Sequence, residues 1–172
     1  MYQILSRIAE GLARALALVG GAVLVGIIAL TCVSIIGRVF VPLDIGIGPI
    51  RGIYDITEIA MATAVFAFLP WAQIREAHAR VDLFEPRFPL RLNRLLDLLF
   101  NIAMAFVAGF GTWRLYLGMM DKYSYGETTL IAQIPVWQGY AASLVGACGF
   151  VIVSLFCALR AARRLAGIED HA

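Results

Sequence analysis

The chain has 172 residues, of which 61% are hydrophobic and 15% are charged, and its formal net charge is +2. Soluble domains have closer to about 45–50% apolar and about 25% charged residues, so this composition excludes an ordinary soluble domain. The small net charge argues against a nucleic-acid partner. No stretch outside the apolar runs is long enough for a soluble catalytic domain, so we expect one membrane domain over residues 1–172 and no enzyme.

Four long apolar runs predict four membrane-spanning helices, at about residues 15–37, 55–75, 95–120 and 135–160. The first run has no Asp, Glu, Lys or Arg. It would form about 35 Å of helix, enough to cross a hydrocarbon core of about 30 Å. The run is longer than a signal-peptide core of about 7–15 residues, so we interpret it as a retained signal anchor. Because lipid cannot satisfy backbone groups, the fold class is an all-α integral membrane four-helix bundle.

Lysine and arginine are distributed unequally among the connections. Ten of the 14 lie in the N-terminal stretch, the connection between the second and third spans, and the C-terminal tail. The other two connections hold four. Since these residues concentrate on the cytoplasmic side of a membrane, both termini are predicted to be cytoplasmic.

Two segments beside the spans have an interfacial pattern. At the N-terminus, apolar side chains share one helical face, and Gln3, Arg7, Glu10 and Arg14 lie opposite. In residues 81–95, leucine and phenylalanine alternate with arginine. We expect both to be short amphipathic segments in the headgroup layer, with their arginines toward anionic membrane lipid.

Several chemistries find no support in the sequence. Cys32, Cys148 and Cys157 fall inside apolar runs and form no C-x-x-C motif, so we predict that they are packing residues. His78 and His171 lie outside the spans, which argues against a haem held between helices. No nucleotide-binding, nucleophile or metal-ligand pattern occurs, so we predict no cofactor and no metal.

Asp55 and Glu58 form the first of three polar groups, one helical turn apart at the external entrance of the second span. Carboxylates at this position suit the dipole of a helix N-terminus. The alternatives are a contact with a partner, a buried pair with Arg38 or Arg51, and, least favoured, ion binding.

The second group is a stripe of Asn93, Asp97 and Asn101, spaced by four residues on one face of the third helix. Such a stripe is costly inside a membrane unless it faces protein. Three interpretations stay open: packing against another helix or subunit, an interfacial ion pair of Asp97 with Arg94 or Arg91, and a proton or ion route.

The third group is His78, Arg80 and Asp82, which alternate in the loop that follows the second span. The group forms either a turn that faces solvent or headgroups, or a specific turn that orients the second and third helices.

Four elements of the sequence carry a family resemblance: residues 52–58 (GIYDITE), residues 71–83 (WAQIREAHARVDL), Leu96-Asp97, and residues 134–137 (IPVW). In this order, along nearly the whole chain, they resemble the small four-helix, DctQ-like membrane subunit of tripartite ATP-independent periplasmic transporters. The His-x-Arg-Val-Asp element is the most specific. The chain departs from the family pattern at Asp55, where a Glu is frequent, and near residues 142–144, where a Pro is absent.

The resemblance implies a multi-pass protein of the bacterial inner membrane that pairs with a large multi-span transporter subunit. It implies that a periplasmic substrate-binding protein captures an organic acid and docks on the external face, and that a sodium gradient drives uptake. The small subunit would be a scaffold without a substrate site. Its candidate interface or structural residues are Asp55, Glu58, His78, Arg80, Asp82, Asp97 and Asn101.

The external loops around Asp44 and from Asp121 to Glu127, together with Asp55 and Glu58, give the outer face a local acidic excess. Asp44, Asp121 and Glu127 are therefore the candidate residues for docking the binding protein. Two rival classes remain. A self-sufficient small transporter normally needs an ionisable residue near the middle of a span, where this sequence is apolar. A membrane anchor of another complex usually has histidines in its spans or a soluble extension.

Overall fold

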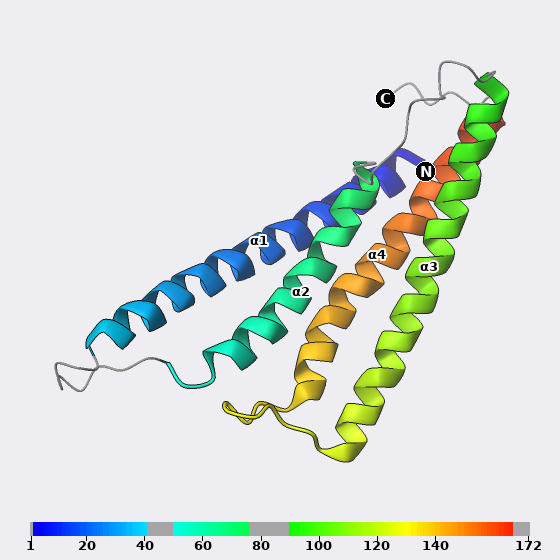
Figure 1. The fold of residues 1–172 in the computed structure, drawn as a ribbon. Coiled ribbons are helices and arrows are strands. Elements are labelled where there is room, and N and C mark those ends of the chain that lie inside the picture. Colours follow the sequence, from blue (N-terminus) through cyan, green and yellow to red (C-terminus); the bar gives the residue numbers. More distant parts are fainter. Residues whose placement is uncertain (1, 41–49, 76–89, 167–172) are drawn as a thin grey trace.

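The computed structural model describes residues 2–40, 50–75 and 90–166 of the chain. This part forms four α-helices, α1 (Tyr2–Phe40), α2 (Ile53–Ile74), α3 (Leu90–Tyr125) and α4 (Val136–Leu165), as Figure 1 shows. Each helix is long and apolar enough to cross a membrane. The structure therefore confirms the predicted all-α, four-helix membrane fold.

Two helices begin well before the predicted spans. α1 begins at Tyr2 rather than near residue 15, and α3 begins at Leu90 rather than near residue 95. The amphipathic N-terminal segment is therefore continuous with the first membrane helix. No proline occurs within either helix, so nothing breaks the run of backbone hydrogen bonds where the sequence changes from polar to apolar.

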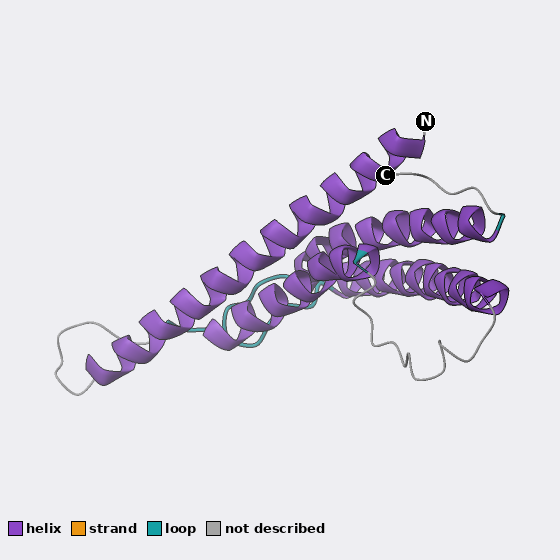
Figure 2. Cartoon of the chain, turned by 90° about the horizontal axis from the view of Figure 1, so that it is seen from above, coloured by secondary structure: helices purple, strands orange, loops and turns teal. Residues whose placement is uncertain are grey.

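The helices are arranged as an open row in the order α1, α2, α4, α3. α2 packs against α1 and α4, α4 packs against α2 and α3, and α1 also touches α4. The starts of α1 and α3 and the ends of α2 and α4 lie toward one end of the row, and from there the helices fan out (Figures 1 and 2). We call this the terminal end, and we call the opposite end, with residues 50–52 and 126–135, the loop end.

The main apolar core lies toward the terminal end, where three helices meet. It consists of Ala9, Ala13, Ile74, Val153, Phe156 and Cys157. Alanines on α1 let this helix approach α2 and α4 closely, because a methyl side chain keeps the backbones near each other. Farther along, α1 separates from α4, which accounts for the fan (Figure 1).

Close contact between α2 and α4 depends on Gly146. A Cβ atom at this position would lie 2.6 Å from the carbonyl carbon of Phe66 and 2.7 Å from its oxygen. Small residues also let α1 approach α2: a Cβ atom on Gly20 of α1 would lie 3.1 Å from the Cβ atom of Ala67, and both Ala64 and Ala67 are buried. Small residues thus mark the places where α2 meets its neighbours most closely, as is usual for membrane helices.

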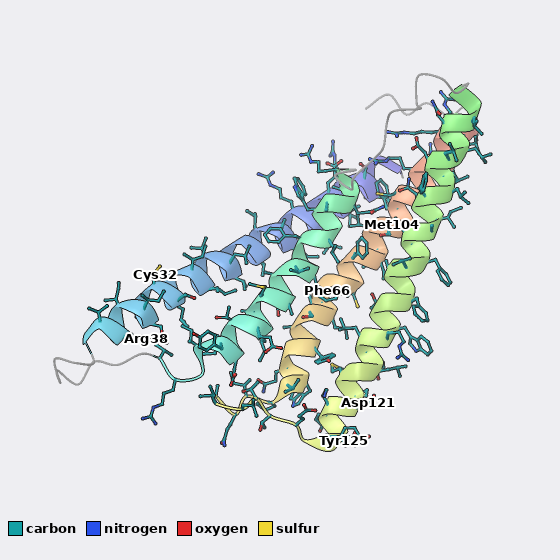
Figure 3. The ribbon with its side chains drawn as sticks, in the orientation of Figure 1. Cys32, Arg38, Phe66, Met104, Asp121 and Tyr125 are labelled. Carbon is teal, nitrogen blue, oxygen red and sulfur yellow. The ribbon has the colours of Figure 1, made fainter. Side chains whose placement is uncertain are left out.

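The predicted packing role of the cysteines holds within this chain for Cys157 alone. Cys157 is buried, whereas Cys32 and Cys148 are exposed. Figure 3 shows Cys32 projecting outward from α1. An apolar run cannot by itself indicate which side of a helix faces protein, because in lipid both sides are apolar.

Candidate functional site

At the loop end, one carboxylate joins α2 to the connection between α3 and α4. Oδ2 of Asp55 accepts hydrogen bonds from the backbone N–H groups of Ile131, at 2.9 Å, and Ala132, at 2.8 Å. We call this contact the Asp55 clasp. Hydrogen bonds to an ionised acceptor are stronger than neutral ones, so the clasp fixes the loop relative to α2.

Gly52 makes the clasp possible. This residue precedes α2 with a φ of 75°, in the left-handed region that favours glycine. A Cβ atom on Gly52 would also lie 2.6 Å from the Cβ atom of Ala132. Both the backbone conformation and the close approach of the loop therefore require glycine here.

The loop between α3 and α4 is ordered by its own hydrogen bonds. The N–H of Thr129 donates to the carbonyl of Ile134 at 2.9 Å, and the N–H of Ile134 donates to Oγ1 of Thr129 at 3.0 Å. The N–H of Val136 donates to the carbonyl of Glu127 at 3.0 Å. These bonds close a narrow loop whose tip presents Leu130, which is 96% exposed.

An aromatic contact joins the two helices that flank this loop. The rings of Tyr123 and Trp137 meet edge to face with centroids 5.6 Å apart, which joins the end of α3 to the start of α4. The elements GIYDITE and IPVW, which lie far apart in the sequence, therefore meet at the loop end through Asp55 and the loop that precedes Pro135.

Three residues were predicted to dock a partner. Asp121 and Glu127 are exposed at the loop end, and Asp44 lies outside the described residues. Figure 3 shows Asp121 near the end of α3. Glu127 forms an ion pair with Lys122, so its charge is partly balanced by a neighbour.

Asp55 and Glu58 differ in environment although they lie one turn apart. The hydrogen bonds of the clasp come from backbone amides and not from Arg38 or Arg51, the two arginines considered as partners. Glu58 is exposed. The carboxylate of Asp55 also lies in the first turn of α2, where the helix dipole favours negative charge.

The polar stripe of α3 touches α2 through Asn101. Oδ1 of Asn101 accepts a hydrogen bond from Nε2 of Gln73 at 3.3 Å, and its Nδ2 donates to the carbonyl of Asp97 at 2.8 Å. Gln73 is only 4% exposed. Gln73 was not predicted as a candidate residue, although a glutamine within an apolar run is a signal that could have indicated it.

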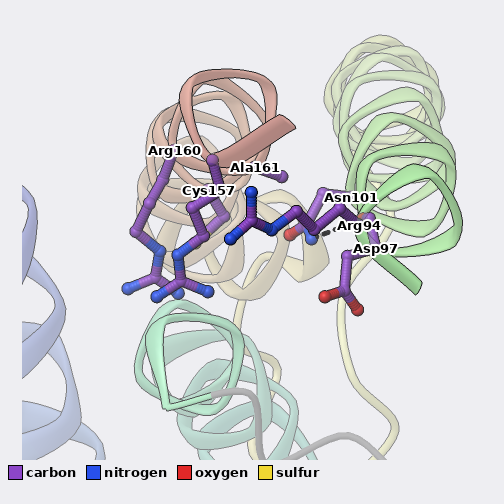
Figure 4. A pocket seen from close by; sticks show the side chains of 7 residues that line it. Arg94, Asp97, Asn101, Cys157, Arg160 and Ala161 are labelled. Carbon is purple, nitrogen blue, oxygen red and sulfur yellow. Dashed lines mark hydrogen bonds between the residues drawn. The ribbon is translucent and has the colours of Figure 1, made fainter. Parts of the chain in front are cut away.

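A recess lies beside Asn101 at the terminal end, between α3 and α4 (Figure 4). The side chains that line this arginine recess are Arg94, Asp97, Asn101, Cys157, Arg160, Ala161 and Arg164. On α4, Arg160 and Arg164 continue the helical face that carries buried Val153 and Cys157. The inward face of α4 thus changes from apolar to basic at this end.

His78, Arg80 and Asp82 lie outside the described residues. The helix that leads to them ends with Trp71 and Arg75 in contact, the guanidinium carbon lying 4.6 Å from the ring centroid. Within the described part of the chain, no group of three His, Cys, Asp or Glu residues could hold a metal ion.

The family model described as the DctQ component of tripartite ATP-independent periplasmic transporters matches residues 27–167. Neither the curated proteins nor the solved structures give a match. The matched region includes α2, α3 and α4 completely and therefore both the Asp55 clasp and the arginine recess.

Proposed function

This chain belongs to the family of DctQ components of tripartite ATP-independent periplasmic transporters, and from that premise we propose its part in transport. It is the small permease subunit of a sodium-driven, binding-protein-dependent secondary transporter for an organic acid. In this assignment it scaffolds a large multi-span subunit and helps to dock the periplasmic substrate-binding protein. Family membership makes the chain a component of a transporter. The arrangement of its helices, its exposed side chains and its charges support the more specific roles proposed.

The open row of helices is the observation that carries the scaffold assignment. In the most apolar 18-residue stretch of each helix, only 6% of the residues are buried in α1 and 6% in α3, compared with 50% in α4. A row with α1 and α3 at its edges encloses no passage of its own, and it offers broad apolar faces to other helices. These features favour a scaffold over a self-sufficient transporter.

The outer face of α3 is the best candidate surface for the large subunit. Phe106, Phe110 and Trp113 are all more than half exposed. Their rings form a continuous series, with centroids 6.4 Å apart for Phe106 and Phe110 and 6.0 Å apart for Phe110 and Trp113. Large aromatic side chains of this kind supply much of the contact energy at protein interfaces.

The orientation follows from the distribution of charge. In the proposed arrangement the terminal end is cytoplasmic, because it carries Arg160, Arg163 and Arg164 on α4 and Arg94 on α3. The loop end then faces the periplasm. This places the Asp55 clasp and the loop tip where a periplasmic protein can reach them.

The proposed docking surface combines the loop tip with acidic residues around it. Leu130 and Ile131 are exposed at the tip, and Asp121 and Glu127 lie near its base. Asp44 is proposed as a further contact. Since rim charges mainly set the association rate, basic residues on the binding protein would be steered to this surface.

Uptake by the reconstituted complex tests the scaffold assignment. The chain alone in liposomes should transport nothing, whereas the chain with its large partner and binding protein should support sodium-driven uptake. The two membrane subunits should also co-purify at a fixed ratio. Sodium-driven uptake by the small subunit alone would contradict the proposal and favour the self-sufficient transporter.

Charge reversal tests the docking surface. Asp44→Lys with Glu127→Lys should raise the binding-protein concentration needed for half-maximal uptake and should leave the maximal rate nearly unchanged. Glu127→Lys also breaks the ion pair with Lys122, so Lys122→Gln is the matched control that breaks the pair and keeps the carboxylate. Unchanged uptake at limiting binding protein would place the docking surface elsewhere.

A further inference from the structure

Among the described residues that line the arginine recess, positive charges outnumber negative ones. Three guanidinium groups, of Arg94, Arg160 and Arg164, line it together with one carboxylate, that of Asp97. Figure 4 shows Arg94 extending from α3 into the gap between the helices, with Arg160 on the α4 side and Asp97 on the opposite side. Guanidinium groups from α3 and from α4 therefore line the same recess.

The level of the recess along α4 matches the level of lipid phosphates. Residues 136–159 contain no charged side chain and form about 36 Å of helix, slightly more than the hydrocarbon core of about 30 Å. Arg160 is the first charged residue after this stretch. It therefore lies where hydrocarbon ends and headgroups begin.

The recess between the arginines is shallow. Arg94, Asp97, Arg160 and Arg164 each interact with their surroundings. The enclosed part of the recess has room for about one water molecule. A ligand would therefore lie over the guanidinium groups at the surface, where their fork geometry suits the oxygens of a phosphate.

A polar connection runs from this recess into the protein. Asn101 lines the recess and accepts a hydrogen bond from Gln73, which is buried and only 4% exposed. Among the described residues, Oε1 of Gln73 has no hydrogen-bond partner. This acceptor calls for a donor such as a water molecule, which would reach it from the recess by way of Asn101.

Apolar surface adjoins the recess on both helices. Leu95 and Leu99 on α3 and Leu155 and Leu159 on α4 are each between 46% and 60% exposed. All four lie within about two helical turns of an arginine of the recess. An anion bound here with apolar chains attached would cover leucine surface as well as satisfy charge.

We propose that the arginine recess binds the phosphate of an anionic phospholipid headgroup, with the acyl chains along the exposed leucines of α3 and α4. The bound lipid neutralises part of the positive charge and joins the ends of the two helices. Basic pockets between membrane helices are a recurrent solution for such headgroups.

Lipid titration of the purified full chain tests the proposal. In phosphatidylcholine nanodiscs, added phosphatidylglycerol should raise the melting temperature and should remain bound in native mass spectrometry, whereas additional phosphatidylcholine should do neither. Arg160→Gln with Arg164→Gln should weaken phosphatidylglycerol binding roughly 30-fold. Arg38→Gln with Arg51→Gln is the matched control, because both arginines are exposed at the loop end, outside the recess.

Two further measurements complete the test. Inorganic phosphate distinguishes binding of a lipid from binding of a free ion, and Asp97→Asn distinguishes a change in binding from a defect in folding. Inorganic phosphate at equal concentration should leave the melting temperature unchanged; an equal rise would overturn the lipid assignment. Asp97→Asn increases the positive charge of the recess and should strengthen phosphatidylglycerol binding. Unchanged binding in Asp97→Asn together with retained binding in the double glutamine variant would overturn the proposal.

Discussion

The inner helix α4 and the outer helix α3 have a similar apolar character but different surroundings. Both are long and apolar and contain glycine. In the most apolar 18-residue stretch, however, half of the residues of α4 are buried and only 6% of those of α3 are buried. A Cβ atom on Gly146 of α4 would meet the backbone of Phe66, whereas one on Gly109 of α3 would meet nothing within 4 Å. Hydropathy thus identifies a membrane helix without indicating its neighbours.

The largest expected effect separates these two glycines. Gly146→Ala places a methyl group 2.6 Å from the carbonyl carbon of Phe66, so α2 and α4 must move apart. The cost should be about 1–3 kcal/mol or more, because well-packed interiors resist added volume. Gly109→Ala is the matched control and should change stability little. Thermal unfolding in detergent measures both, and equal melting temperatures would refute the distinction between the two helices.

The next effect concerns the inner face of α3 itself. Asn101→Leu leaves the buried Nε2 of Gln73 without its acceptor, which should cost about 1–3 kcal/mol. The double variant Gln73→Leu with Asn101→Leu removes both partners and should recover part of that loss. A double-mutant cycle on the melting temperatures measures the coupling. Additive losses would show that the two side chains do not stabilise each other.

A smaller and more local effect is expected at the loop end. Asp55→Ala removes the acceptor for the amides of Ile131 and Ala132, so these two N–H groups should exchange with solvent faster. Glu58→Ala is the matched control on the same helix. Hydrogen-exchange mass spectrometry of residues 126–135 compares the two variants. Equal protection in both would mean that the clasp does not hold the loop.

The smallest effect on the chain alone is expected on the outer face of α3. Phe106→Ala with Phe110→Ala removes exposed aromatic surface, so the melting temperature of the isolated chain should hardly change. Co-purification with the large subunit should fall, because aromatic anchors contribute strongly to interfaces. The reverse pattern, with a lower melting temperature and unchanged co-purification, would assign this face to the stability of the chain itself.

Much of the fold could be predicted from local features, whereas the candidate site could be predicted only in part. The four spans follow from apolar length. The start of α1 at Tyr2 was not predicted, because the change from polar to apolar residues suggested a boundary that the helical backbone does not have. Asp55 was recognised as a polar candidate, but its partners are amides 76 and 77 residues away, which no local pattern indicates.

The sequence by itself determined the membrane class, the number of spans and the family, because apolar length and short motifs are properties of neighbouring residues. Tertiary structure alone decided the order of the helices, the contact of Gln73 with Asn101, and the convergence of Arg94 on α3 with Arg160 on α4. These features depend on which face of each helix meets protein. In lipid, hydrophobicity does not distinguish those faces, so close packing and a few hydrogen bonds select them.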